Sequence, residues 1–291
     1  MNPQAAPREP MHVPDSTPGA WERYEFLEGW PDQLETIQSL EGGLLELVPR
    51  PCVWYAPLRA PLLFRTVRGD FDARTCVRVH GRSGDVPSVM GSLGGLMLRQ
   101  ATGVQAADWT RPMDNYVVFA TGVASGTSGF DAAIEITSTV NGQSGLETYR
   151  SEHTWTELRI IRLGAVLALL HRFDGTDWQF TQLSDVDRTG EFDYQGSGLL
   201  VRPDLPADLQ VGLTVMADWS TILNHAEGGF NNEYFQFPER FNTQVLRNGH
   251  PDTRAIFKGT SIRSVELPAH WHRKNLTRHV HLAEWLEVFG D

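Results

Sequence analysis

The sequence predicts an all-β protein, a sandwich or barrel of antiparallel strands, and three observations support this fold class. Short segments in which apolar and polar residues alternate recur along most of the chain, as in half-buried strands. Turn-forming dipeptides and Gly/Ser stretches separate these segments, as hairpin connections require. Helical periodicity is almost absent before residue 281. Closely spaced strands without intervening helices are typical of sandwiches and barrels.

The first predicted strands lie between residues 44 and 123. Residues 44–48, LLELV, form a short apolar run before two prolines. Residues 69–80, GDFDARTCVRVH, alternate, so that Phe71 and Val77 take the core face and Arg74 and Arg78 the other. Residues 94–100 and 116–123 are the next predicted strands.

The second group of predicted strands begins after a Gly/Ser loop. Residues 130–140 alternate, and a three-stranded meander spans residues 157–183, with Asp174-Gly175 as a hairpin turn because glycine tolerates positive φ. Residues 209–217 alternate again and end at Asp218-Trp219. The C-terminal residues 281–291 fit a helix as well as a terminal strand.

Composition limits the organisation and the ligand classes. The chain of 291 residues carries a net charge of −11, which disfavours nucleic acid and anionic membrane surfaces as partners. Residues 1–19 are Pro-rich and predict a flexible arm, and residues 20–291 predict one domain. No apolar run reaches the roughly 18 residues of a membrane span, and no hydrophobic signal segment is visible, so we expect a soluble, cytoplasmic protein.

The chain has two cysteines, Cys52 and Cys76, which do not form a CxxC motif. Low cysteine use fits a reducing compartment. A disulfide between the two residues is possible but not required. Arg74 and Arg78 flank Cys76 on one strand face and could lower the pKa of its thiol. The alternative is a polar face with an incidental cysteine.

Five motifs follow one another between about residues 40 and 219: GDFDARTCVRV, GGLMLRQ, LRIIRLG, FDGTDWQF and LPADLQVGLTVMADW. In this order they resemble the concanavalin A-like lectin/glucanase superfamily, most of all its largely uncharacterised bacterial branch. The resemblance implies a jelly-roll sandwich of two antiparallel sheets with a carbohydrate ligand across the concave sheet. Members include lectins, glycan-binding modules, glycoside hydrolases and polysaccharide lyases, so the fold leaves the function open.

The acidic signature of the hydrolases is absent, and the segment AAIEITSTV offers only Glu135. Glu135, Arg99 and Asp218 lie out of phase with the apolar residues of their strands, so they should point away from the core. If their strands form the concave sheet, Glu135 and Asp218 could serve as catalytic acid and base, with Arg99 binding substrate. The alternative is a solvated face with ion pairs.

Aromatic residues at loop and strand ends are further candidates for sugar stacking. Trp109 lies in the loop QAADWTRPMDN, and Trp178 follows the Asp-Gly turn. Together with Arg74 and Arg78 they form the remaining predicted substrate-binding set. The alternative for each tryptophan is ordinary core or edge packing.

Residues of about 220–280 predict a long insertion before the last element, because sandwich connections are usually about 4–6 residues. Such an insertion is a binding wall or lid, or else a structural elaboration or homo-oligomer contact. The pairs His270/His272 and His279/His281 raise a metal hypothesis, for which no complete ligand set is visible. No cofactor can be named.

Two function classes therefore remain. The first is a carbohydrate-active enzyme, a glycoside hydrolase or polysaccharide lyase, with its substrate in the concave groove. The second is a non-catalytic glycan-binding or protein-interaction module.

Overall fold

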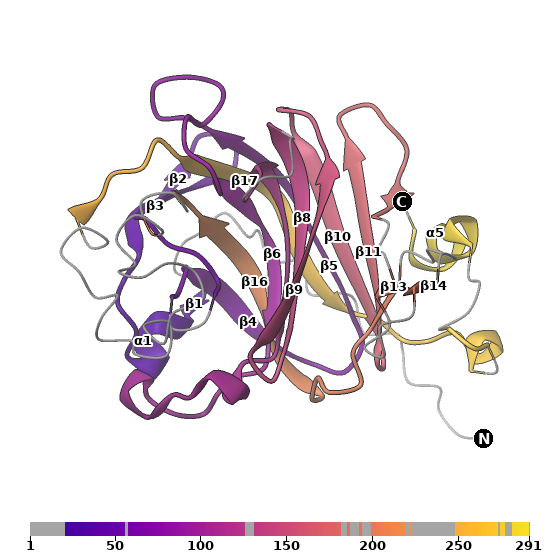
Figure 1. Cartoon of the computed structure of the whole chain (residues 1–291). Coiled ribbons are helices and arrows are strands. Elements are labelled where there is room, and N and C mark those ends of the chain that lie inside the picture. Colours follow the sequence, from indigo (N-terminus) through magenta and orange to yellow (C-terminus); the bar gives the residue numbers. More distant parts are fainter. Residues whose placement is uncertain are drawn as a thin grey trace.

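The computed structural model describes residues 21–55, 58–125, 131–181, 199–218, 222, 248–272, 274–276 and 281–290, with the backbone of 185–186 and 192–193. The described residues form two antiparallel sheets that pack face to face. Two short helices, α1 (Tyr24–Glu28) and α5 (Leu282–Phe289), lie on opposite sides of this sandwich (Figure 1). None of the described helices is long and apolar enough to cross a membrane.

The first sheet has seven strands in the order β1-β4-β16-β6-β7-β8-β9. Its strands are β1 (Glu22–Arg23), β4 (Leu62–Arg68), β16 (Asp208–Met216), β6 (Leu93–Arg99), β7 (Tyr116–Val123), β8 (Ala132–Val140) and β9 (Gln143–Arg150). All neighbours in this sheet are antiparallel.

The second sheet has eight strands in the order β12-β11-β10-β5-β17-β3-β2, with β15 also paired to β11. Its strands are β12 (Gln179–Phe180), β11 (Val166–Phe173), β10 (Thr156–Leu163), β5 (Phe71–His80), β17 (Arg254–Ser264), β3 (Leu44–Pro49), β2 (Leu34–Leu40) and β15 (Leu199–Val201). The strands β13 (Asp185–Val186) and β14 (Phe192–Asp193) form a separate pair.

The helical elements are short. The α-helices are α1 (Tyr24–Glu28) and α5 (Leu282–Phe289), and the described 3-10 turns are η2 (Ala106–Asp108), η3 (Arg111–Met113) and η5 (Ala269–Trp271).

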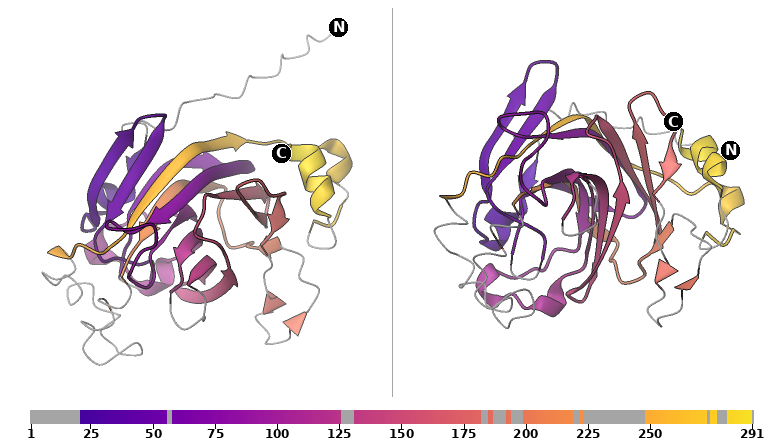
Figure 2. Two further views of the ribbon diagram at one scale, coloured as in Figure 1. Left: turned by 90° about the horizontal axis from the view of Figure 1, so that it is seen from above. Right: turned by 45° about the horizontal axis from the view of Figure 1, so that its top comes forward.

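The main core lies between the two layers seen in Figure 2. Leu209, Leu213 and Val215 of β16 meet Phe71 and Val77 of β5 in one cluster of fully buried side chains. Alternate residues of each strand supply this cluster, because successive side chains of a strand point to opposite faces. The predicted jelly-roll sandwich is confirmed.

The structure differs from expectation at the C-terminal end. Residues 254–264, which fall inside the insertion expected at about 220–280, form β17 in the middle of the eight-stranded sheet. Residues 282–289 form a helix, which settles the open alternative between helix and strand. Trp285 and Phe289 pack with Trp271 on the outer face of β10 and β11.

Candidate functional site

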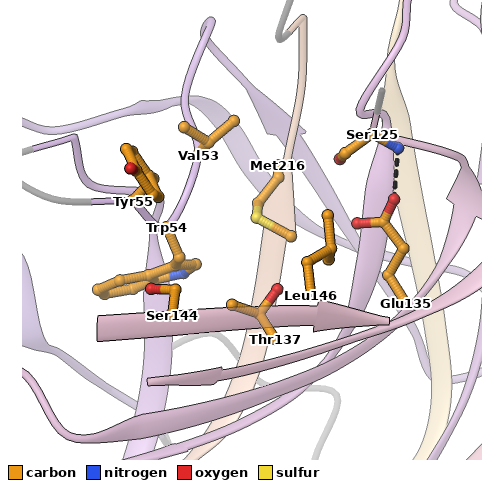
Figure 3. A pocket seen from close by; sticks show the side chains of 9 residues that line it. All are labelled: Val53, Trp54, Tyr55, Ser125, Glu135, Thr137, Ser144, Leu146 and Met216. Carbon is orange, nitrogen blue, oxygen red and sulfur yellow. Dashed lines mark hydrogen bonds between the residues drawn. The ribbon is translucent and has the colours of Figure 1, made fainter. Parts of the chain in front are cut away.

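A pocket of about 270 Å³ opens on the outer face of the seven-stranded sheet, the face turned away from the main core. Figure 3 shows Trp54 and Tyr55 at one end of the view and Glu135 with Ser125 at the other. The lining residues are Val53, Trp54, Tyr55, Ser125, Glu135, Thr137, Ser144, Leu146 and Met216.

The aromatic wall comes from residues 50–61, which we call the crossing loop, described here except for residues 56–57. Prolines punctuate this segment, and a two-residue bridge between Cys52 and Ala217 attaches it to the end of β16. The Trp54 Nε1–H donates to Thr214 Oγ1 at 2.8 Å, and the Thr214 hydroxyl donates to the Pro61 carbonyl at 2.7 Å. These bonds fix the indole against the sheet.

The Trp54 side chain packs against other aromatic rings in a buried cluster. Its ring lies 5.1 Å from that of Tyr24 and 5.7 Å from that of Tyr116, measured between centroids. The Tyr116 hydroxyl donates to the Trp54 carbonyl at 2.9 Å. Trp54 is only 3 % exposed, so it forms a wall of the pocket and not a free stacking platform.

The opposite wall comes from the β8–β9 hairpin. Asn141 and Gly142 both have positive φ, the conformation of a tight two-residue turn that matches the twist of the flanking strands. This turn sets the register in which Thr137 pairs with Leu146. Ser144 and Leu146 are exposed, so a hydroxyl and an apolar side chain stand at the mouth of the pocket.

Glu135 is the acidic group of the pocket and is 2 % exposed. The backbone N–H of Ser125 donates to its Oε2, as the dashed line in Figure 3 marks. Burial raises the pKa of Glu135 to about 7, while the hydrogen bonds from Ser125 oppose this rise. The carboxyl can therefore exchange a proton near neutrality.

Arg99 shares the outer face of this sheet but does not line the pocket. Its guanidinium forms two hydrogen bonds to Glu28, at 2.9 and 3.1 Å, and one to Gln210 at 3.1 Å. The same group stacks over Tyr24, 4.8 Å from the ring centroid. Arg99 thus attaches α1 to the sheet in this structure.

Trp109 also lies on this side of the sandwich and is buried. Its Nε1–H donates to Asp114 at 3.1 Å, and the Arg59 guanidinium lies over its ring at 4.7 Å. Arg59 also stacks on Trp30 and pairs with Asp114. The contacts of Trp109 are therefore those of packing within the aromatic cluster.

Asp218 lies just beyond the end of β16, with φ of +62°, and does not line the pocket. Glu135 pairs with Ala120, Ala120 with Gly95, and Gly95 with Thr214, so three strand spacings, about 14 Å, separate β8 from β16. Asp218 then lies four residues beyond Thr214, about 13 Å further along the strand direction. The structure does not bring these two carboxyl groups together.

Three predicted binding residues lie on the opposite face of the sandwich. Strand β5 belongs to the eight-stranded sheet, so Arg74 and Arg78 point to the outer face of that sheet, where they pair with Asp72 and Asp85. Trp178 packs beneath α5 and is 2 % exposed. A single groove that contains these residues and Glu135 is therefore wrong, because alternation alone does not say to which sheet a strand belongs.

Both cysteines are free thiols, and they lie on the outer faces of different sheets. Burial raises the pKa of Cys76 to about 11, and Lys258 opposes this effect. The idea that Arg74 and Arg78 activate this thiol is wrong, because desolvation outweighs the neighbouring charges. The alternative interpretation, an incidental cysteine on a polar face, agrees with the structure.

Within the residues that the structure describes, no group of three or more His, Cys, Asp and Glu side chains could hold a metal ion. His279 and Trp219 lie outside the described residues. His171, at the end of β11, contacts the Thr181 hydroxyl through Nδ1 at 2.8 Å, and burial lowers its pKa to about 4.

The sequence signals for the missed pocket residues are local. Trp54 and Tyr55 are adjacent aromatic residues between closely spaced prolines, which indicates an extended segment lying on a surface. Thr137 follows Glu135 by two positions, and the Asn-Gly turn places Leu146 opposite Thr137. No signal in the sequence places the crossing loop over this sheet.

No family model matches the chain, and no curated protein matches it. Among solved structures, a functionally unknown protein from Saccharomyces cerevisiae is similar at 12% identity and a TM-score of 0.50, over 86% of this chain and 99% of that chain. The xylan β-1,4-xylosidase from Bacillus halodurans C-125 is 14% identical, with a TM-score of 0.45, over 78% of this chain and 34% of the xylosidase.

The winged bean acidic lectin complexed with methyl-α-D-galactose is 12% identical, with a TM-score of 0.43, over 81% of this chain and 94% of the lectin. At such identities, a likeness between structures shows the fold alone. Together with the two antiparallel sheets, the likeness to the yeast protein shows a β-sandwich fold.

Proposed function

We propose that this protein binds a glycan and seats one sugar unit in the pocket between the crossing loop and the β8–β9 hairpin. The observation that carries the proposal is the mixture of side chains in the pocket. Trp54, Met216 and Leu146 present apolar surface, while Thr137 and Ser144 present hydroxyls. Sugars combine an apolar ring face with a rim of hydroxyl groups, so they match such a lining.

The size of the pocket supports a single sugar unit. Its volume of about 270 Å³ lies near the lower limit of small-molecule sites, roughly 300 Å³. Ser144 and Leu146 are exposed at its mouth, so further units of a glycan chain can extend into solvent. The pocket therefore fits the end of a glycan better than the middle of a long polymer.

Binding without cleavage is the function that the geometry supports best. Glycoside hydrolysis usually needs two carboxyl groups, about 5 to 9.5 Å apart. Glu135 is the only carboxyl group among the described residues that line the pocket. Catalysis is a second candidate because the pKa of Glu135, about 7, suits a general acid at neutral pH.

The test is a glycan panel, screened for retention and for product release, followed by calorimetric titration of each ligand that is retained. The variant Leu146→Ala should weaken binding about fivefold or more, because it removes apolar surface at the pocket mouth. Leu27→Ala is the matched control, since Leu27 is 53% exposed and Leu146 51%, and Leu27 does not line the pocket.

Retention of no glycan at millimolar concentration, or equal losses in the two leucine variants, would show that the pocket is not a sugar site. Product release that disappears in Glu135→Gln would favour catalysis over binding alone.

A further inference from the structure

The described lining of the pocket contains one acid and no base. Glu135 is its only carboxyl group, Tyr55 is its only other titratable side chain, and no lysine, arginine or histidine is present. A negatively charged ligand would find no cation there to compensate its desolvation. The lining thus selects against acidic, sulfated or phosphorylated sugars.

Glu135 differs from five other buried acids of the described residues, each of which pairs with an arginine. Asp72, Asp114 and Glu28 are each bound to an arginine, with N–O distances between 2.8 and 3.1 Å. Glu25 and Glu46 also pair with arginines. The described residues provide no such cation for Glu135, whose carboxylate accepts a hydrogen bond from the Ser125 backbone N–H.

The residues directly opposite Glu135 on the sheet are uncharged, and Arg150, two residues beyond Thr148 on β9, does not line the pocket. Ala120 of β7 and Thr148 of β9 are its partners across the strands, and Thr137 follows it on the same face of β8. Met216 comes from β16. An ionised carboxylate buried among such groups carries a desolvation cost that a bound cation would offset.

We propose that the sugar unit seated in this pocket carries a protonated amine, and that its ammonium group binds the Glu135 carboxylate. This inference rests on the proposed function and adds the ligand class to it: an amino sugar with a free amine. The ring then packs between Met216 and Leu146, which lie between Glu135 and Trp54 in the view of Figure 3. Charge-assisted hydrogen bonds of this kind are about twice as strong as neutral ones.

Binding of the ammonium group should displace a proton from Glu135. Because the pKa of the free carboxyl is about 7, most molecules hold this proton at pH 6. An adjacent cation favours the charged form, so the proton leaves as the amine binds.

The experiment compares three oligosaccharides of equal length by calorimetry at pH 6: one of glucosamine, its fully N-acetylated counterpart, and one of glucose. The glucosamine oligomer should bind wild-type protein about tenfold more tightly or better than the other two. In Glu135→Gln this preference should fall to about threefold or less. Titration in two buffers of different ionisation enthalpy should show close to one proton released by wild type and none by the variant.

Equal affinity of wild type for the three oligomers overturns the amine inference and leaves the glycan proposal intact. A preference that survives in Glu135→Gln overturns it as well, because the amine is then recognised elsewhere. Binding of none of the three at millimolar concentration, with another glycan bound, also overturns it. Failure of every glycan removes the proposed function together with this inference. If the variant does not fold, the affinities of wild type for the three oligomers decide by themselves whether the amine inference stands.

Discussion

Replacement of Glu135 by glutamine should stabilise the protein above pH 7 and leave its stability almost unchanged near pH 4.5. The glutamine amide oxygen can accept the same hydrogen bond from the Ser125 N–H, and the two side chains have nearly the same shape. What the substitution removes is the cost of ionising a buried carboxyl. The expected effect is therefore electrostatic and depends on pH.

Its size follows from the pKa of Glu135, which burial raises from 4.5 to about 7. The folded protein keeps the proton between these two values, whereas the unfolded chain loses it above pH 4.5, so the stability of wild type falls as pH rises. At roughly 1.4 kcal/mol per pH unit, the loss reaches about 3 kcal/mol at pH 7 and stays constant above. Glu135→Gln lacks this loss.

The assay is urea unfolding of wild type and Glu135→Gln from about pH 4.5 to about pH 8.5, followed by tryptophan fluorescence. The difference between the two free energies of unfolding isolates Glu135, because His80 and His171 titrate in both proteins and cancel. Glu152→Gln supplies a matched control, since Glu152 is exposed on the protein surface. Its difference from wild type should stay within about 0.5 kcal/mol throughout.

A difference curve for Glu135→Gln that is flat across this range would refute the reasoning, since Glu135 would then titrate alike in both states. A curve that rises toward low pH would also refute it, because the sign would require a cationic partner that holds the carboxyl ionised.

Two further predictions concern the framework. Asp72→Asn should lower the free energy of unfolding by about 3 kcal/mol or more, because it leaves the buried Arg159 without its counter-charge; a smaller change in urea unfolding would contradict this. Gly212→Ala should abolish soluble expression, since its Cβ would lie 1.8 Å from the Leu63 carbonyl oxygen. Gly145→Ala, whose Cβ has its nearest neighbour at 4.0 Å, should express normally, and equal yields would refute the steric explanation.

The fold was predictable because alternation is a property of each strand by itself. Strand β5 was expected at residues 69–80 and occupies Phe71–His80, and the strand expected at 209–217 is β16. Strand β17 was missed because RAIFKGTSIRS has a register shift between Lys258 and Ser261 that interrupts the alternation. Long-range pairing, which puts β17 beside β5, leaves no local signal.

The site was predictable only in part, for the same physical reason. The alternation on its strand predicted that Glu135 points away from the core. The structure agrees, because Glu135 lies on the outer face of the seven-stranded sheet. Phase does not tell which sheet a strand joins, so Arg74 was placed with Glu135 although it lies on the opposite face. Trp54 was missed because the position of the crossing loop depends on contacts with Thr214, 160 residues away in sequence.

The place of β17 in the eight-stranded sheet bears on how the chain is made. This strand, the last of the described strands in sequence, lies between β5 and β3, so each of these two strands has one unpaired edge until residues 254–264 have left the ribosome. Unpaired strand edges invite pairing with other chains, and closing such distant contacts is slow. A nascent chain that ends before β17 should therefore depend on chaperones, and a nonsense mutation just upstream of Arg254 should yield aggregate, although every residue of the pocket has already been synthesised.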